Sequence, residues 1–255
     1  MDELLAKLVH SMRNRLNAMV LEATDLGERL AERLPHQAAA AIHAEVQPLI
    51  VQARDAAQWL KTVRDRATPP EPRPTPVRVR QWAEPSLLHK LAAPTESDTA
   101  AGTDAPDSAP RRAGTHLRIA DDIPQDAEAQ WDTALVTAAL RELWLNAWES
   151  IELDHPCDQP PAPPTPGAAL VTITLTSPAP GTALWTITSP APARPSTQLT
   201  PEYLATLGHP GHTRRRQHLG LGCSFAVAVA RQHHGQCTWR LAEKLVIAEL
   251  ALPMK

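Results

Sequence analysis

Apolar residues recur every three or four positions along the first thirty residues, which is the spacing of one face of a helix. This heptad seam consists of Leu5, Val9, Met12, Leu16, Met19, Ala23, Leu26 and Leu30. The pattern predicts a helix from about Asp2 to Leu34 that packs along other helices in a coiled coil or bundle. A matching seam predicts a second helix, kinked at Pro48. Its members are Ile42, Val46, Leu49, Ala53, Ala56, Leu60 and Val63.

The two predicted helices are joined by the short connection Pro35-His36-Gln37. Two long helices with a tight connection and matching seams form an antiparallel hairpin, which has an apolar face along its whole length. A second copy of the chain would cover that face. We therefore expect residues 1–68 to be a helical dimerisation domain, and the chain to be a homodimer with a four-helix bundle.

A proline-rich segment follows, and then the hydrophobic pattern changes. Residues 69–76 contain five prolines and predict a stiff, extended hinge. In residues 77–255, helical periodicity is mixed with short alternating segments. The expected strands are Val77–Gln81, His116–Ala120, a hairpin of Leu170–Thr176 with Ala183–Thr188, Cys237–Leu241 and Val246–Leu252. The expected helices are Glu84–Ala92, Trp131–Ile151 and Ser224–Gln232. This order predicts an α+β domain with helices on one face of a mostly antiparallel sheet.

Composition and charge limit the partners and the cellular compartment that we expect for this chain. The chain has 25 Lys and Arg against 28 Asp and Glu, a net charge of -3, which does not favour nucleic acid as a partner. Three scattered cysteines indicate a reducing compartment without a disulfide framework. We see no signal peptide and no apolar run long enough for a bilayer, so we expect a cytoplasmic protein that is not in a membrane.

Glu142 and Asn146 lie four residues apart, and therefore on one face of the predicted helix. A carboxylate beside an amide carbonyl suits a magnesium ion that also holds phosphate oxygens. A solvent-facing polar stripe is the alternative interpretation of this pair taken alone.

Two further motifs point to phosphate. Gly220 and Gly222 directly precede a predicted helix, and paired glycines at a helix N-terminus let backbone N–H groups approach an anion. Just upstream, Arg214, Arg215 and Arg216 would clamp the phosphates of a nucleotide. A solvated basic loop explains the arginines equally well.

In chain order, these motifs resemble the two-component sensor histidine kinases, whose ATPase domain is of the gyrase, heat-shock-protein-ninety and MutL kind. Glu142 to Ala147 resembles the asparagine box of that family. The run from Gly220-Leu221-Gly222 to His233-x-Gly235 resembles its second glycine box, and Gly208 to Thr213 resembles the stretch leading to its lid. His10-x-x-Arg13-Asn14 resembles the phosphoacceptor box on the first dimerisation helix.

The resemblance implies roles for these residues. His10 would carry a phosphoryl group on an imidazole nitrogen, and Asn14 fills the place of a residue that helps water attack a phosphorylated partner. Asn146 would hold magnesium, Glu142 would orient the ion or a nucleophile, and Gly220 and Gly222 would cradle the triphosphate of ATP. The partner would be the receiver domain of a response regulator.

The sequence also departs from the family. The first glycine box, Asp-x-Gly-x-Gly, is replaced by Ser189-Pro190-Ala191-Pro192-Ala193, which removes the carboxylate that accepts the adenine amino group. Position 11 is Ser11 where the family has an acidic residue, so no neighbour raises the basicity of His10. These losses favour a histidine phosphotransferase derived from a kinase, which passes phosphate through His10 to or from a response-regulator aspartate. A divergent but active ATP-dependent histidine kinase remains the alternative.

Two other classes stay open. Six possible zinc ligands lie in one region, although their spacing matches no recognised zinc pattern: His209, His212, His218, His233, His234 and Cys237. A dimeric scaffold that binds a signalling partner without chemistry differs from the phosphotransferase only in the role of His10.

Overall fold

The computed structural model describes residues 2–84, 87–92, 114–152, 171–191, 200–209 and 221–255. They divide into two compact units, one ending at Thr68 and the other beginning at Pro69.

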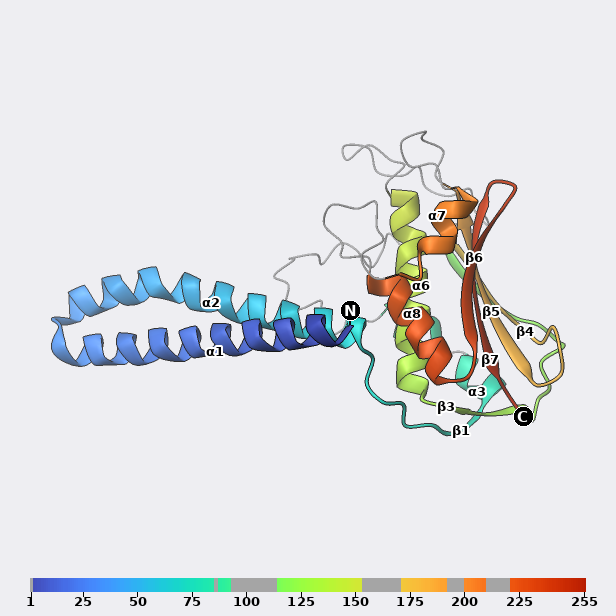
Figure 1. Ribbon diagram of the computed structural model, residues 1–255, viewed down its shortest axis with the longest axis horizontal. Helices are drawn as coiled ribbons and strands as arrows, with labels where there is room; N and C mark the ends of the chain where they lie inside the picture. Colours follow the sequence, from blue (N-terminus) through green and yellow to red (C-terminus); the bar gives the residue numbers. More distant parts are fainter. Residues whose placement is uncertain (1, 85–86, 93–113, 153–170, 192–199, 210–220) are drawn as a thin grey trace. The chain divides into compact units, whose positions relative to one another are not determined.

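The first unit is an antiparallel pair of helices, α1 (Asp2–Arg33) and α2 (His36–Ala67) (Figure 1). The fixed φ of Pro35, -53°, starts α2, and its carbonyl accepts hydrogen bonds from the N–H groups of Ala38 and Ala39. The second helix continues through Pro48. The predicted hairpin is therefore confirmed.

Only part of the predicted seam is covered within the hairpin. Among the described side chains of the hairpin, the buried hydrophobic residues are Val20, Ile50, Ala57, Leu60 and Val63, and only Leu60 and Val63 of these belong to the predicted seam. Other seam residues remain accessible: Met12 (46% exposed), Met19 (60%), Leu26 (55%) and Leu49 (63%). The hairpin thus keeps an apolar face that its own two helices do not bury.

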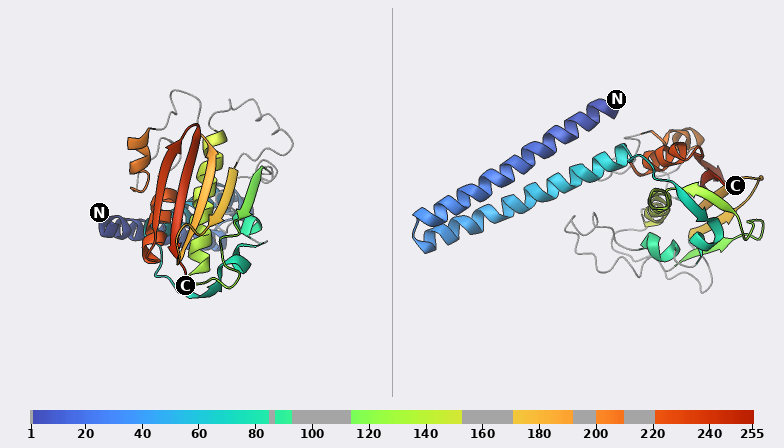
Figure 2. Two further views of the ribbon diagram at one scale, coloured as in Figure 1. Left: turned by 90° about the vertical axis from the view of Figure 1, so that its right-hand side faces the viewer. Right: turned by 90° about the horizontal axis from the view of Figure 1, so that it is seen from below.

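The second unit contains a five-stranded sheet in the order β2-β4-β5-β7-β6. Its strands are β2 (Thr115–Ile119), β4 (Val171–Thr176), β5 (Thr182–Pro190), β6 (Gln236–Ala242) and β7 (Leu245–Pro253). Only β2 and β4 pair in parallel. Helices α6 (Thr133–Glu152) and α8 (Leu221–Gln232) cover one face of the sheet (Figures 1 and 2). This is the predicted α+β arrangement.

The core lies between that face and the two helices. Leu140 and Leu143 of α6, Val229 of α8, and Ile173 and Leu175 of the sheet all belong to one cluster of buried hydrophobic residues. The strict alternation of buried and half-buried positions in β4 and β5 explains why the sequence predicted this hairpin correctly. Because α6 and α8 pack against each other as well as on the sheet, the first turn of α8 meets the middle of α6.

The segment after the prolines was predicted incorrectly in part. The strand expected over Val77–Gln81 is β1 (Thr75–Arg78), which is followed by the short helix α3 (Val79–Ala83). Val79 and Ala83, one turn apart, are both fully buried, and Arg80 forms an ion pair with Glu84 at 3.2 Å. This helical i, i+4 pattern outweighs the short β-like run. Helix α4 (Leu87–Ala92) falls within the predicted helix.

Two elements were not predicted. β3 (Glu128–Trp131) pairs antiparallel with β1 in a second, two-stranded sheet. α7 (Pro201–Thr206) begins at Thr200, whose hydroxyl accepts a hydrogen bond from the N–H of Tyr203. Both elements are short, and β3 exists because a partner 50 residues away in sequence supplies its hydrogen bonds.

Candidate nucleotide and phosphotransfer sites

The asparagine-box residues lie on α6, on the side that faces the start of α8. Glu142 and Asn146 are half-buried one turn apart, whereas Leu143 and Ala147 beside them point into the core. The amphipathic pattern of α6 thus fixes which side of the helix carries the polar pair.

The two side chains reach the second glycine box at Gly222. A methyl group built on Gly222 would lie 2.6 Å from Oε2 of Glu142 and 3.3 Å from Nδ2 of Asn146. A residue with a Cβ would therefore displace the carboxylate. Oxygen ligands next to the first turn of a helix are the combination that suits magnesium and phosphate, because the free N–H groups there favour anions.

Cys223 is a neighbour of this pair that sequence reasoning missed. Nδ2 of Asn146 donates to its Sγ at 3.4 Å, and the thiol is buried. The amide nitrogen makes this bond, whereas the atom type suited to Mg²⁺ is the amide oxygen of Asn146. The signal in the sequence was the position of Cys223 directly after Gly222, in the same box.

The other end of the candidate site, where the resemblance predicts that adenine binds, differs from the family pattern. Ser189 is almost fully buried at the end of β5, opposite Val246 of β7. The sheet continues one residue past β5, since the N–H of Ala191 donates to the carbonyl of Lys244 at 2.7 Å. Ser189 offers a hydroxyl where the family resemblance expects a carboxylate, and the backbone of residues 189–191 is already paired with β7 and Lys244. The residues present thus fit a magnesium-phosphate group at one end of the site and lack the adenine acceptor at the other.

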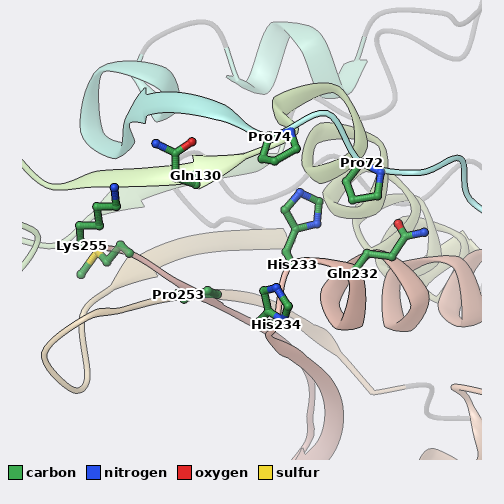
Figure 3. A pocket seen from close by; sticks show the side chains of 9 residues that line it. Pro72, Pro74, Gln130, Gln232, His233, His234, Pro253 and Lys255 are labelled. Carbon is green, nitrogen blue, oxygen red and sulfur yellow. The ribbon is translucent and has the colours of Figure 1, made fainter.

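The far end of α8 is built for structure. His233 is buried, its Nδ1 lies 2.8 Å from the carbonyl of Val229, and its Nε2 accepts the N–H of Asp132 at 2.9 Å. The ring is therefore neutral with its proton on Nδ1. Figure 3 shows His233 beside Pro72 and Gln232, in a cleft of about 270 Å³ that also involves Pro74.

These contacts argue against the zinc alternative at two of its candidate ligands, His233 and Cys237. Both ring nitrogens of His233 are used by the backbone. Burial, reinforced by the neighbouring Cys223, raises the pKa of Cys237, which keeps this thiol protonated and a poor metal ligand. Among the described residues, no group of three His, Cys, Asp or Glu side chains could hold a metal ion. His212 and His218 lie outside the described residues.

The phosphoacceptor residues belong to the hairpin unit. Position 10 lies within α1, and nothing of its side chain is described. Asn14 is exposed one turn further along the same helix. Gly220 and the three arginines Arg214, Arg215 and Arg216 lie outside the described residues, so their predicted roles stay predictions.

No protein-family model and no curated protein matches this chain. Among solved structures, full-length ShkA in complex with AMPPNP is similar at 17% identity and a TM-score of 0.53, over 100% of this chain and 46% of the other. The mycobacterial sensor histidine kinase MprB is similar at 16% identity and a TM-score of 0.48, over 72% of this chain and 99% of the other. A histidine kinase from Burkholderia phymatum STM815 is similar at 17% identity and a TM-score of 0.40, over 99% of this chain and 97% of the other.

The chain spans just under half the length of the ShkA chain, and the likeness covers both of its units. Its fold is that of a histidine-kinase core, a helical hairpin together with an ATPase-type α+β domain. None of the helices among the described residues combines the length and the apolarity that crossing a bilayer requires.

Proposed function

We propose that this chain is a two-component signalling protein that passes a phosphoryl group through His10 to or from an aspartate of a response-regulator receiver domain. The observation that carries the proposal is the contrast between the two ends of the ATPase-like site. Glu142 and Asn146 meet the start of α8, whereas the buried Ser189 is the residue that the family resemblance aligns with the adenine-binding carboxylate. A protein that obtains phosphate from a phosphorylated partner does not need the base-binding end.

The transfer itself needs little from the protein beyond a nucleophile and its positioning. An imidazole nitrogen of His10 attacks the phosphorus of an aspartyl phosphate, the bond between phosphorus and the carboxylate oxygen breaks, and the aspartate leaves as a carboxylate. The reverse step returns the phosphoryl group to another aspartate. Asn14, exposed one turn away, would position water or the partner's phosphoryl group.

The same proposal includes a homodimer. Met12, Met19 and Leu26 lie at heptad spacing on α1, and Leu49 is the most exposed large apolar residue among the described side chains of α2. Apolar rows of this length on a helical hairpin are stabilised when a second hairpin covers them. The second copy would complete a four-helix bundle around residues 12–26 and 42–56.

An active kinase is the second candidate, and a specific contact favours it. The contact with Gly222 places a carboxylate oxygen of Glu142 at a helix N-terminus, with the amide group of Asn146 beside it. If ATP and Mg²⁺ bind, Asn146 and Glu142 would hold the ion and the start of α8 would receive the phosphates. The bound nucleotide would then supply the phosphoryl group for His10.

The decisive experiment uses two phosphate donors on the purified full chain. Phosphoramidate, a small donor that releases ammonia when it phosphorylates histidine, should label the wild type with an acid-labile, alkali-stable phosphate, and His10→Gln should remain unlabelled. His36→Gln, at the start of α2, is the matched control and should label normally. Absence of labelling in the wild type would leave the scaffold alternative.

Calorimetry with ATP and Mg²⁺ separates the two catalytic candidates. We expect no binding tighter than about 1 mM, which corresponds to about 4 kcal/mol. Tighter binding that Asn146→Ala abolishes, together with labelling of His10 from ATP, would establish the kinase instead.

A further inference from the structure

A polar groove lies between the two helices of the hairpin, within one or two turns of position 10. Arg13 and Asn17 line it from α1, and Arg54, Gln58 and Lys61 line it from α2. Its volume is about 240 Å³. The three basic side chains occupy neighbouring turns, so they span about 10 Å along the hairpin.

The groove presents hydrogen-bond donors and no carboxylate. Nε of Arg13 is buried and has no hydrogen-bond partner among the described residues. No ion pair joins Arg13, Arg54 or Lys61 to a described acidic side chain, whereas the nearby Asp65 is paired with Arg64 at 2.6 Å. An unpartnered guanidinium donor that faces two further cations has no internal counter-charge, which favours an anionic ligand.

Acidic and basic residues are unevenly distributed along the hairpin, with the basic residues gathered near the groove. Residues 4–21 of α1 contain Lys7, Arg13 and Arg15 and no acidic residue, although the whole chain carries a net charge of -3. Residues 22–49, toward the turn, contain five acidic and only two basic side chains. The part of the hairpin that contains the groove, residues 2–21 with 50–67, has seven basic and four acidic residues, and its net positive charge would attract an anion.

We infer that this groove is a binding site for a phosphate-class oxyanion. Resting on the proposed function, we assign the anion as the phosphoryl group on its way to or from His10. Positions 10, 13 and 17 share one side of α1, since residues three and four apart in a helix are neighbours. The Arg13 guanidinium matches two phosphate oxygens at once, while Arg54 and Lys61 neutralise the remaining charge from α2.

The first test measures the binding of pyrophosphate to the full chain by calorimetry at low ionic strength, where screening is weak. Arg13→Gln and Lys61→Gln, from opposite walls, should each weaken binding about tenfold or more, as expected for the loss of a charge-assisted bond. Arg15→Gln removes an identical charge two residues away on α1, outside the groove, and should change the affinity by less than about twofold. Equal loss in Arg15→Gln, or no saturable binding, overturns the site.

The second test distinguishes the source of the anion. If the groove holds the phosphoryl group in transit, pyrophosphate should compete with the labelling of His10 by phosphoramidate, and Arg13→Gln should slow this labelling while Arg15→Gln does not. Arg13-dependent binding without any effect on labelling would instead identify a site for free phosphate and overturn the assignment to transfer. Pyrophosphate binding in a chain whose His10 cannot be labelled would refute the proposed function and leave the oxyanion site standing.

Discussion

The main-chain N–H of Asp132 donates a hydrogen bond of 2.9 Å to Nε2 of His233, joining the start of α6 to the end of α8. Asp132 in turn accepts the N–H of Arg73 at 2.9 Å through Oδ2, so the proline-rich segment is held at the same point. Three segments that are remote in the sequence are therefore fixed by two residues. The histidine that the family resemblance placed at the end of the glycine box has a structural role here.

His233→Ala should destabilise the α+β unit by about 2–3 kcal/mol. The substitution removes a buried ring and leaves the N–H of Asp132 without its acceptor, whereas the carbonyl of Val229 keeps the hydrogen bond from the backbone N–H of residue 233. Urea unfolding followed by tryptophan fluorescence measures the loss. His234→Gly is the matched control: His234 is exposed with φ +59°, a conformation that glycine adopts without strain, so this variant should be neutral or slightly stabilised. Equal destabilisation by both changes would contradict the assigned role.

Asp132 should make the stability of the same unit depend on acid pH. Partial burial alone would raise its pKa, but hydrogen bonds from the N–H groups of Arg73, Leu135 and Ala134 lower the pKa below the ordinary value of 3.8. The stabilisation is therefore complete above about pH 4 and is lost as the pH falls through the lower folded value.

Asp132→Ala should cost about 1 kcal/mol at neutral pH, the usual effect of removing an N-cap. The difference in Tm between variant and wild type should shrink as the pH falls below 3.8, because the wild-type carboxylate becomes protonated. Asp132→Asn retains a cap and should lose less at neutral pH. A Tm difference that stays constant down to pH 2 would show that the charge is unimportant.

Gly235→Ala should be much more destabilising than Gly222→Ala. A methyl group on Gly235 would collide with the backbone carbonyl of Ala251 and lie 2.9 Å from Leu252 Cδ2, and a strand cannot easily move aside. At Gly222 the obstacle is the carboxylate end of Glu142, which is flexible. We expect more than about 3 kcal/mol for the first substitution and about 1 kcal/mol for the second, measured by urea unfolding. The opposite order would show that the contact of α6 with α8 is rigid.

Trp131→Phe should cost about 1 kcal/mol more than Trp185→Phe. Both tryptophans are fully buried and both pack edge-on against Trp82, with ring centroids 5.8 and 5.7 Å away. Nε1 of Trp131 donates to the carbonyl of Pro253 at 2.9 Å, whereas Nε1 of Trp185 has no partner among the described residues. The two phenylalanines leave similar cavities, so the difference in unfolding free energy isolates the hydrogen bond. Equal losses would mean that the bond contributes nothing.

Met19→Glu should convert the proposed homodimer to monomers without unfolding the hairpin. Met19 is 60% exposed, so its replacement buries no charge within one chain but places like charges together in a four-helix bundle. Light scattering measures the mass and circular dichroism the helix content. Leu21→Glu, at a 70% exposed position off the predicted seam, is the control and should stay dimeric. A wild type that is monomeric would refute the dimer directly.

Much of this fold could be predicted because strong periodicity is a local property. The 32-residue helices α1 and α2, the buried face of α6 and the alternation in β4 and β5 all follow from apolar spacing within one segment. β3 and α3 could not be predicted in this way. β3 has only four residues, and its hydrogen bonds come from β1; the segment from Val79 is helical because Val79 and Ala83 are buried together.

For the candidate site, the sequence supplied the residue types but not their contacts. The spacing of Glu142 and Asn146 placed both on one side of α6, and the glycines marked the start of α8, because these are properties of single helices. Only tertiary packing decided the contacts of these residues. Glu142 contacts Gly222, and Asn146 donates to Cys223. The ring nitrogens of His233 bond Val229 and Asp132, and Arg13 lines one groove with Arg54 and Lys61. The sequence determines which side-chain types are present and how they are spaced along each helix. A site also requires that distant segments come together, and burial of the hydrophobic core determines which segments do so.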